Sequence, residues 1–144
     1  MSKRVGLVGC VKQKRFGSSR AEDLYTSPLF LGRRRYVERS CDEWWILSAE
    51  HGLISPQETI APYDKTLKGA PTGDKRAWAE RVLTSIDRMV AVVPGDIVEV
   101  HAGSDYRDFG LVQGLRARGA LVEIPTQGLP VGLQLQFYAR ELRS

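Results

Sequence analysis

The residues best suited to chemistry gather in one segment, 44–67. It opens with an apolar, partly aromatic run, 44–47, which is too short for a helix and favours a buried strand. The polar members that follow are Ser48, Glu50, His51, Tyr63 and Asp64. Pro56 and Pro62 stiffen the connection and a rigid strand positions it, as a segment that holds a substrate requires. The same residue types also cap helices and close turns, so a purely structural loop is the alternative.

The composition is that of a globular domain of ordinary size. With 144 residues, of which 42% are hydrophobic and 26% charged, the chain can bury the core of one domain. Its apolar runs fall far short of the roughly 20 residues that span a membrane, and its start lacks a signal-peptide pattern. We therefore expect a cytoplasmic protein.

The sequence carries no recognisable metal or nucleotide motif. Cys10 and Cys41 belong to no CxxC or Cys/His spacing that would suggest zinc, and we expect both to be free thiols. The glycines of 5–9 form no GxGxxG motif, and no GxxxxGK[ST] motif follows them. We expect neither a metal ion nor a cofactor.

The chain is basic, with a net charge of +4 and a pI near 9.3. Such a charge is compatible with a polyanionic partner but does not require one. The distribution of the charge is more informative than its total, because positive side chains are concentrated in the first part of the chain. They are Lys3, Arg4, Lys12, Lys14, Arg15, Arg20, Arg33, Arg34, Arg35 and Arg39.

Strand and helix patterns alternate along the chain. Short apolar runs predict strands at 5–9, 44–47, 97–101 and 121–124. Spacing and punctuation predict helices at 28–39, between the turns 72–74 and 94–96, at 106–118 and at 131–142. Ser27 is the expected N-cap of the first helix, whose arginines should face outward, and Lys75 lies on the polar face of the second. This alternation of strands and helices predicts a single α/β domain in three layers, with a mostly parallel sheet of four to five strands flanked by helices.

Polar segments follow the four predicted strands. They are 10–14, 48–51, 101–106 and 127–128. In open parallel sheets, ligands bind outside the carboxyl ends of the strands, where such connections meet. Four segments would therefore converge on one edge, which favours a working site over a structural loop at 44–67.

The central segment also resembles a known family. LSAEHGLISP at 47–56, followed by APYD at 61–64, is similar to the LSxxxGLxxP…PY signature of the YaaA-like superfamily. VGCVK at 8–12 stands where that superfamily carries its N-terminal lysine motif. The stretches 101–106 and 125–134 resemble those of a small bacterial and phage branch. The likeness covers essentially the whole chain in element order.

The resemblance implies a DNA-binding α/β protein. It also implies kinship with small members that are DNA glycosylases acting on modified pyrimidines such as 5-hydroxymethyluracil. Two departures limit the likeness. The chain is far shorter than the YaaA proteins, so the DNA contacts of their extra helices are absent, and Cys10 stands where their N-terminal motif differs. The likeness supports nucleic acid as a partner better than it supports one reaction.

Base removal passes through an oxocarbenium-like state, which requires a carboxylate near the anomeric carbon. Asp64 is the first choice and Glu50 the second, while His51 can donate a proton to the departing base. A base rotated out of the stack also needs an aromatic face. The candidates for that face are Tyr25, Phe30 and Tyr63. Core packing explains Phe30 at least as well.

The remaining candidates would hold the DNA. Lys12, Lys14, Arg15, Arg20 and Ser27 suit phosphate contacts, and the amide of Gln127 can read a base edge. The expected substrate-contacting set is completed by Cys10, Ser48, Ser104 and Tyr106. For residues 33–35, a solvated helix face explains the arginines as well as DNA does.

Three functions stay open on the sequence. We favour a metal-independent DNA glycosylase that acts as a monomer on a flipped base in duplex DNA. The second is a nucleoside hydrolase or deoxyribosyltransferase, which would use the same pocket without the basic surface. The third is a non-catalytic DNA-binding protein of the stress response. Salt-dependent binding, base release from a modified duplex and release from free nucleosides would separate them.

Overall fold

The structure, a computed structural model, describes residues 2–9 and 17–143. Its main feature is a five-stranded sheet with the order β4, β3, β1, β6, β7. The strands are β1 (Arg4–Gly9), β3 (Glu43–Ser48), β4 (Gly52–Ile54), β6 (Ile97–His101) and β7 (Leu121–Glu123). β1 pairs in parallel with β3 and β6, β6 pairs in parallel with β7, and β4 runs antiparallel to β3 at one edge. The predicted α/β domain with a mostly parallel sheet is confirmed.

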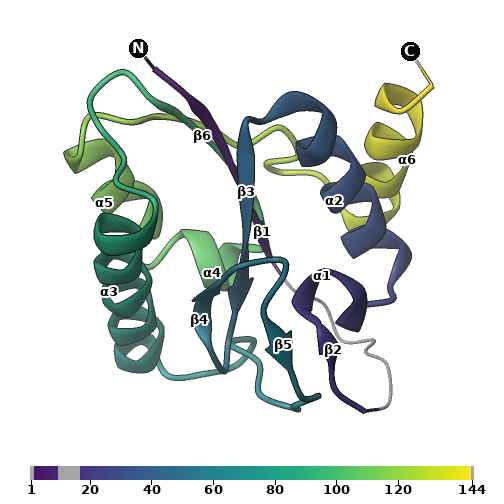
Figure 1. The fold of residues 1–144 in the computed structure, drawn as a ribbon, viewed down its shortest axis with the longest axis horizontal. Helices are drawn as coiled ribbons and strands as arrows, with labels where there is room; N and C mark the ends of the chain where they lie inside the picture. The colour runs from purple at the N-terminus through teal and green to yellow at the C-terminus, as the bar shows by residue number, and fades with distance from the viewer. Residues whose placement is uncertain (1, 10–16, 144) are drawn as a thin grey trace.

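Helices cover both faces of the sheet, as Figure 1 shows. On one face, α2 (Pro28–Ser40) packs against α6 (Val131–Glu141), and α1 (Ala21–Leu24) precedes α2 on the same side. The other face carries α3 (Thr72–Met89), α4 (Ser104–Arg107) and α5 (Leu111–Ala117). The three predicted layers are therefore helices, sheet and helices.

Apolar side chains of the central strands alternate between two cores, as the two-residue period of a strand requires. Leu7, Leu47 and Val100 belong to the core beneath α3 and α5. Val8 and Ile46 belong to the core beneath α1 and α2. The carboxyl ends of these strands are thus held between two packed layers, which makes them a rigid platform for the segments that follow.

The first long helix begins where the sequence predicts. The Ser27 hydroxyl accepts a hydrogen bond from the Phe30 amide at 3.1 Å, and Pro28 fills a first helical position that needs no donor. At the far end of α3, the chain leaves the helix at Val90, and Ala91 adopts a left-handed φ of 55°. Pro94 then excludes any continuation.

Two predicted elements differ in the structure. The helix predicted at 106–118 is divided into α4 and α5, because Gly110 between them has a φ of 122°, outside the helical region. Segment 44–67 is also more regular than an open loop. β4 folds back on β3 through a turn in which Gly52 has a φ of 72°, and β5 (Thr59–Ile60) pairs antiparallel with β2 (Ser19–Arg20).

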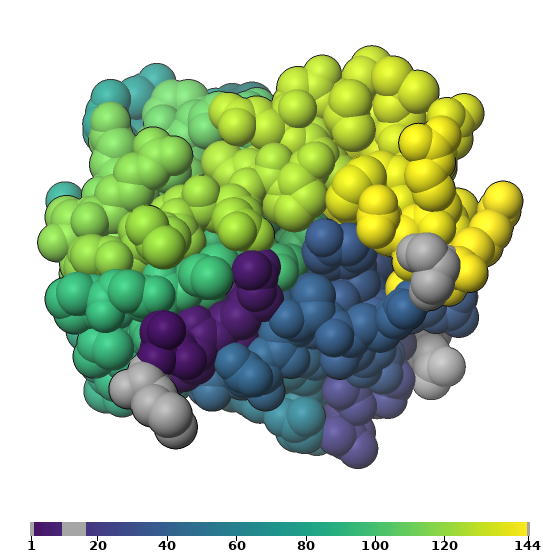
Figure 2. Space-filling view, turned by 90° about the horizontal axis from the view of Figure 1, so that it is seen from above, coloured from purple at the N-terminus to yellow at the C-terminus, as the bar shows by residue number. Residues whose placement is uncertain are grey.

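At the amino end of the sheet, the first residues of the chain are hydrogen-bonded to neighbouring segments. The Ile97 amide donates to the Lys3 carbonyl at 2.9 Å, and the Asp42 amide donates to the Arg4 carbonyl at 2.8 Å. Figure 2 looks onto this end and shows the purple N-terminal segment lying between the blue and the green segments. No helix in the described part of the chain is both long and apolar enough to cross a lipid bilayer.

Candidate functional site

The carboxyl edge of the sheet is where this topology places a ligand. The helix that follows β1 lies on one face, and the helices that follow β6 lie on the other. In open parallel sheets, connections that diverge in this way mark the carboxyl ends of the two neighbouring strands, here Gly9 and His101, as a place where a ligand is expected. The predicted contacts Cys10, Lys12 and Lys14 fall in 10–16, outside the described residues.

Four predicted residues meet at the end of β3. The Ser48 hydroxyl donates to the Tyr63 hydroxyl at 2.7 Å and accepts from the His51 amide at 3.0 Å. The Tyr63 and Tyr25 hydroxyl oxygens lie 2.5 Å apart. The ring of Tyr63 meets the imidazole of His51 edge-on, with the centroids 5.4 Å apart. Ser48 and Tyr25 are buried, Tyr63 is half-buried and His51 is exposed, so the group leads from the core to the surface.

Both predicted carboxylates lie on the surface beside this group. Asp64 follows Tyr63 directly, and Glu50 precedes His51; both side chains are exposed. Neither carboxylate makes a hydrogen bond or an ion pair with another of the residues that the structure describes. Glu50 takes part through its backbone carbonyl, which accepts from Arg81 at 3.3 Å.

Some predicted contacts prove to be core residues. Phe30 is 0% exposed and Tyr25 is 1% exposed, with ring centroids 4.9 Å apart. Neither ring offers a face on which a base can stack. Ser27 is 9% exposed and its hydroxyl caps α2. Of the three aromatic candidates, this leaves Tyr63 as the one that reaches the surface.

The segment after β6 forms a second group, on the α3 side. Tyr106 is half-buried and meets the indole of Trp78 edge-on, with centroids 5.3 Å apart. Lys75, expected on the polar face of its helix, is buried and donates to Asp105 at 2.7 Å. Ser104, at the start of α4, is exposed. The structure therefore places Tyr106 against the core and Ser104 at the rim.

Two further predicted contacts lie on the surface without joining either group. Arg20 is exposed and forms an ion pair with Glu22 at 3.1 Å. Gln127 is exposed in the segment that follows β7. Their exposure is compatible with the expected DNA contacts, and their positions assign them no chemistry.

A buried polar network, which the sequence analysis did not predict, runs along β6. Oε1 of Glu99 lies 2.9 Å from Nε2 of His101, and Nδ1 of His101 lies 2.7 Å from the Tyr138 hydroxyl. Each of these three side chains is at most 1% exposed. Arg4 donates to the other oxygen of Glu99 at 2.6 Å. The sequence contains one signal for this network. Glu99 and His101 are polar residues two positions apart in an apolar strand, and this spacing places both on one face of the strand.

Burial and hydrogen bonding fix the charges in this network. Burial alone raises the pKa of Glu99, but hydrogen bonds from His101 and Arg4 bring that pKa below its ordinary 4.5. Burial lowers the pKa of His101 below 6.5 and raises the pKa of Tyr138 above 10. At neutral pH, Glu99 is a carboxylate and the other two are neutral. Because a carboxylate only accepts, Nε2 carries the imidazole proton and Nδ1 accepts from Tyr138.

Arg33 extends this network to the carboxyl edge, although the sequence predicts it on the outer face of its helix. It is 4% exposed, because α6 packs over that part of α2. Its guanidinium donates to the carbonyl of Gly9 at 3.2 Å and to Oε1 of Gln134 at 3.3 Å. Gln134 donates in turn to the Leu129 carbonyl at 2.8 Å. The end of β1 is thus tied to the segment that follows β7.

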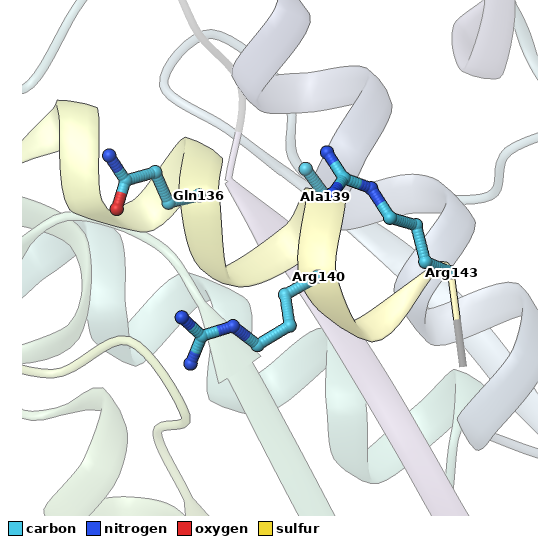
Figure 3. A pocket seen from close by; sticks show the side chains of 4 residues that line it. All are labelled: Gln136, Ala139, Arg140 and Arg143. Carbon is cyan, nitrogen blue, oxygen red and sulfur yellow. The ribbon is translucent and has the colours of Figure 1, made fainter.

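Two hollows in the surface lie at different places. One, of about 320 Å³, lies at the end of β3 between the start of α3 and segment 65–70. The other, of about 420 Å³, lies on the outer side of α6; Figure 3 shows its four lining side chains, all from 136–143, pointing in different directions along one stretch of chain. The first adjoins the candidate site and the second does not. Among the described residues, no group of three or more His, Cys, Asp or Glu side chains is placed to hold a metal ion.

Fold and site together define a single-domain α/β protein with a polar site at the carboxyl edge of its sheet. The chain belongs to a family of unknown function, DUF6884, whose model matches residues 5–140. It is similar to the uncharacterized protein YfjM of Bacillus subtilis (strain 168), with 36% identity over 101 residues, which is 61% of this chain and 67% of that protein. No solved structure matches it.

Proposed function

We propose that this protein is a DNA glycosylase that hydrolyses the N-glycosidic bond of a modified pyrimidine, with 5-hydroxymethyluracil as the first candidate. The observation that carries the proposal is the meeting of Ser48, His51 and Tyr63 at the end of β3, immediately before Asp64. Hydrolysis of a glycosidic bond needs a carboxylate and a proton donor near each other. The resemblance to the YaaA-like superfamily supports the same class of reaction.

In the proposed reaction, the target nucleotide first leaves the base stack. Asp64 accepts a proton from a water molecule whose oxygen bonds to C1′ of the sugar. The C1′–N1 bond breaks, its electron pair stays with the pyrimidine, and His51 supplies the proton that the base takes up. The negative charge of Asp64 also favours the positive charge that develops on the sugar. The products are the free base and an abasic site, and solvent restores both side chains.

Tyr63 is a positioning residue in this scheme. Its hydroxyl is held from two sides, by Ser48 at 2.7 Å and by Tyr25 at 2.5 Å. The ring therefore has little freedom to turn, and it keeps the backbone that enters Asp64 in one place. Preorganisation of this kind is how an active site gains rate without new contacts.

Positive side chains along the same edge support a DNA partner. Segment 65–68 and the first turns of α3 carry exposed Lys65, Lys68, Arg76 and Arg81. Lysine and arginine at such a rim contact phosphates and release counterions, which supplies affinity that does not depend on sequence. A glycosylase needs these phosphate contacts because it must hold a duplex while one nucleotide is extruded.

The proposal is tested with a set of duplexes that each carry one modified pyrimidine. We expect release of the free base and an abasic product from at least one duplex, with 5-hydroxymethyluracil released fastest. Binding to all the duplexes without release from any would contradict catalysis and favour a DNA-binding protein. Release from free nucleosides but from no duplex would favour a nucleoside hydrolase.

A further inference from the structure

The pocket at the end of β3 has a shape and a lining that the catalytic group does not explain. It measures about 320 Å³ and lies against Ala49, the residue that follows β3, and Trp78 of α3. Small-molecule sites in proteins range from about 300 to 1,000 Å³. The volume therefore suits a ligand of the size of one nucleotide rather than a large cofactor.

Small side chains keep this pocket open. Ala49, Ala70 and Ala77 all line it, and each presents only a methyl group. A larger residue at such a position would fill space that is otherwise available to a ligand. Ala77 is exposed on α3, so the hollow opens to solvent at that side.

The aromatic wall of the pocket is fixed. The indole nitrogen of Trp78 donates to the Ser48 carbonyl at 2.8 Å, and the ring meets Tyr106 edge-on at 5.3 Å between centroids. Trp78 is 5% exposed, so its position is set by the core and not by solvent. Only a small part of the indole faces the pocket, and with the alanine methyl groups it forms a rigid apolar wall for an extruded base.

The polar lining has both signs of charge. Lys65 and Arg81 are exposed cations at the rim, where a phosphate can be neutralised. Asp74 and Thr66 offer acceptors and a hydroxyl donor to the edge of a base. Asp64 directly precedes Lys65 in the chain, so the backbone of the candidate catalytic residue adjoins the lining of this pocket.

From these observations we propose that the pocket receives the extruded pyrimidine nucleotide, with the base in the hollow that the three alanines and the edge of Trp78 line and the phosphate between Lys65 and Arg81. This assignment rests on the proposed function, since it names the place where the target nucleotide is held during cleavage. It adds residues that the sequence analysis did not select: Ala77 and Trp78 set the space, and Arg81 sets the preference for a phosphorylated ligand.

The test compares two alanine-to-leucine changes on exposed helix surfaces. Ala77→Leu fills this pocket, while Ala139→Leu fills the hollow on α6 shown in Figure 3 and serves as the matched control. Leucine is a good helix former, so both variants should fold, which circular dichroism verifies. The probe is 5-hydroxymethyl-2′-deoxyuridine 5′-monophosphate, and the measurement is its dissociation constant by calorimetry.

We expect Ala77→Leu to weaken binding of the monophosphate by about tenfold or more, which is about 1.4 kcal/mol, and Ala139→Leu to leave it unchanged. Arg81→Ala should weaken binding of the monophosphate but not binding of the unphosphorylated nucleoside. Equal binding by Ala77→Leu and wild type, or no binding by wild type at millimolar probe, overturns the pocket assignment.

The pocket and the reaction can fail separately. If the monophosphate binds and Ala77→Leu abolishes binding, but no duplex loses a base, the pocket stands and the glycosylase proposal falls. If duplexes lose a base at the same rate with Ala77→Leu as with wild type, the glycosylase proposal stands and the pocket assignment falls.

Discussion

The hydroxyl of Tyr138 donates to Nδ1 of His101 across 2.7 Å, deep inside the protein and 37 positions apart in the chain. The pair joins α6 to β6 near the carboxyl edge. Glu99 holds the other imidazole nitrogen at 2.9 Å, so the ring is fixed at both ends. Hydrogen bonds at both ring nitrogens stiffen this part of the core, and a buried polar atom that loses its partner is costly.

Tyr138→Phe should therefore destabilise the fold without creating a cavity of any size. The change removes one hydroxyl and leaves the buried Nδ1 of His101 without its donor, which costs about 1–3 kcal/mol in the free energy of unfolding. Urea unfolding followed by circular dichroism measures this difference. Tyr36→Phe is the matched control, because Tyr36 is half-buried and its hydroxyl makes no hydrogen bond to another described residue. Equal losses in the two variants would contradict the role given to Tyr138.

The same network predicts that acid destabilises the protein in two stages. The pKa of His101 is lowered in the fold, so its contribution is complete above about 6.5 and is lost as pH falls through the lower folded value. The pKa of Glu99 is also lowered, so its contribution is complete above about 4.5 and is lost below. The free energy of unfolding should fall from pH 7 to 5.5 and fall further below 4.5.

Urea midpoints at a series of pH values test this prediction. The charged and titratable groups around the imidazole are Glu99, Arg33, Tyr36 and Tyr138. In His101→Gln the first stage should be absent. If the urea midpoint of the wild type does not change between pH 7 and 5.5, the neutral form of His101 adds no stability.

Local patterns predicted most of the elements. The strand at 97–101 follows from its apolar run, and α2 begins at Pro28 because Ser27 and the proline mark a helix start. These signals lie within a few residues of one another, so a single sequence contains them. The mostly parallel pairing follows from the alternation of strand and helix, whereas the order of the strands was not predicted.

The errors have a different origin, since each depends on what packs against a residue. Arg33 looks like a surface arginine until α6, about a hundred positions later, covers it. Gly110 interrupts a run of residues with helical spacing because its φ is 122°. The spacing of Glu99 and His101 indicates two polar side chains on one face of a strand but not their burial, and Tyr138 carries no mark that distinguishes it from any other helix tyrosine. In the candidate site, the contact of Ser48 with Tyr63 depends on how segment 55–62 folds, which spacing alone does not define.

Cys41 should react slowly with alkylating agents. Burial raises the pKa of its thiol to about 12, against the opposing effect of the Ser40 hydroxyl. The reactive form is the thiolate, which is scarce at pH 8 when the pKa is this high. In a Cys10→Ser background, we expect iodoacetamide to label Cys41 much more slowly in the folded protein than in urea. Similar rates in the two states would contradict the expected protection.

Asp64→Asn tests the proposed catalytic carboxylate. The amide keeps the shape of the side chain but neither accepts a proton from water nor stabilises positive charge, so base release should fall by about 100-fold or more. Duplex binding should be nearly unchanged, because the substitution removes no positive charge. Asp87→Asn is the control, since Asp87 is exposed on the far half of α3 and its ion pair with Arg118 is a surface contact. Undiminished base release by Asp64→Asn would remove this residue from the chemistry.

The salt dependence of DNA binding tests the basic rim. For B-DNA, the slope of log K against log salt changes by about 0.9 for each phosphate contact. Replacing Lys68 and Arg76 with alanine should therefore lower its magnitude by about 1.8, and the pair Lys12 and Lys14 should behave in the same way. The control replaces Arg140 of α6 and Arg143 just beyond its end, which changes the net charge equally, and α6 lies on the opposite face of the sheet from α3 (Figure 1). If the α6 pair lowers the slope as much as Lys68 and Arg76 do, DNA lies on a different face, and the site at the end of β3 loses its partner.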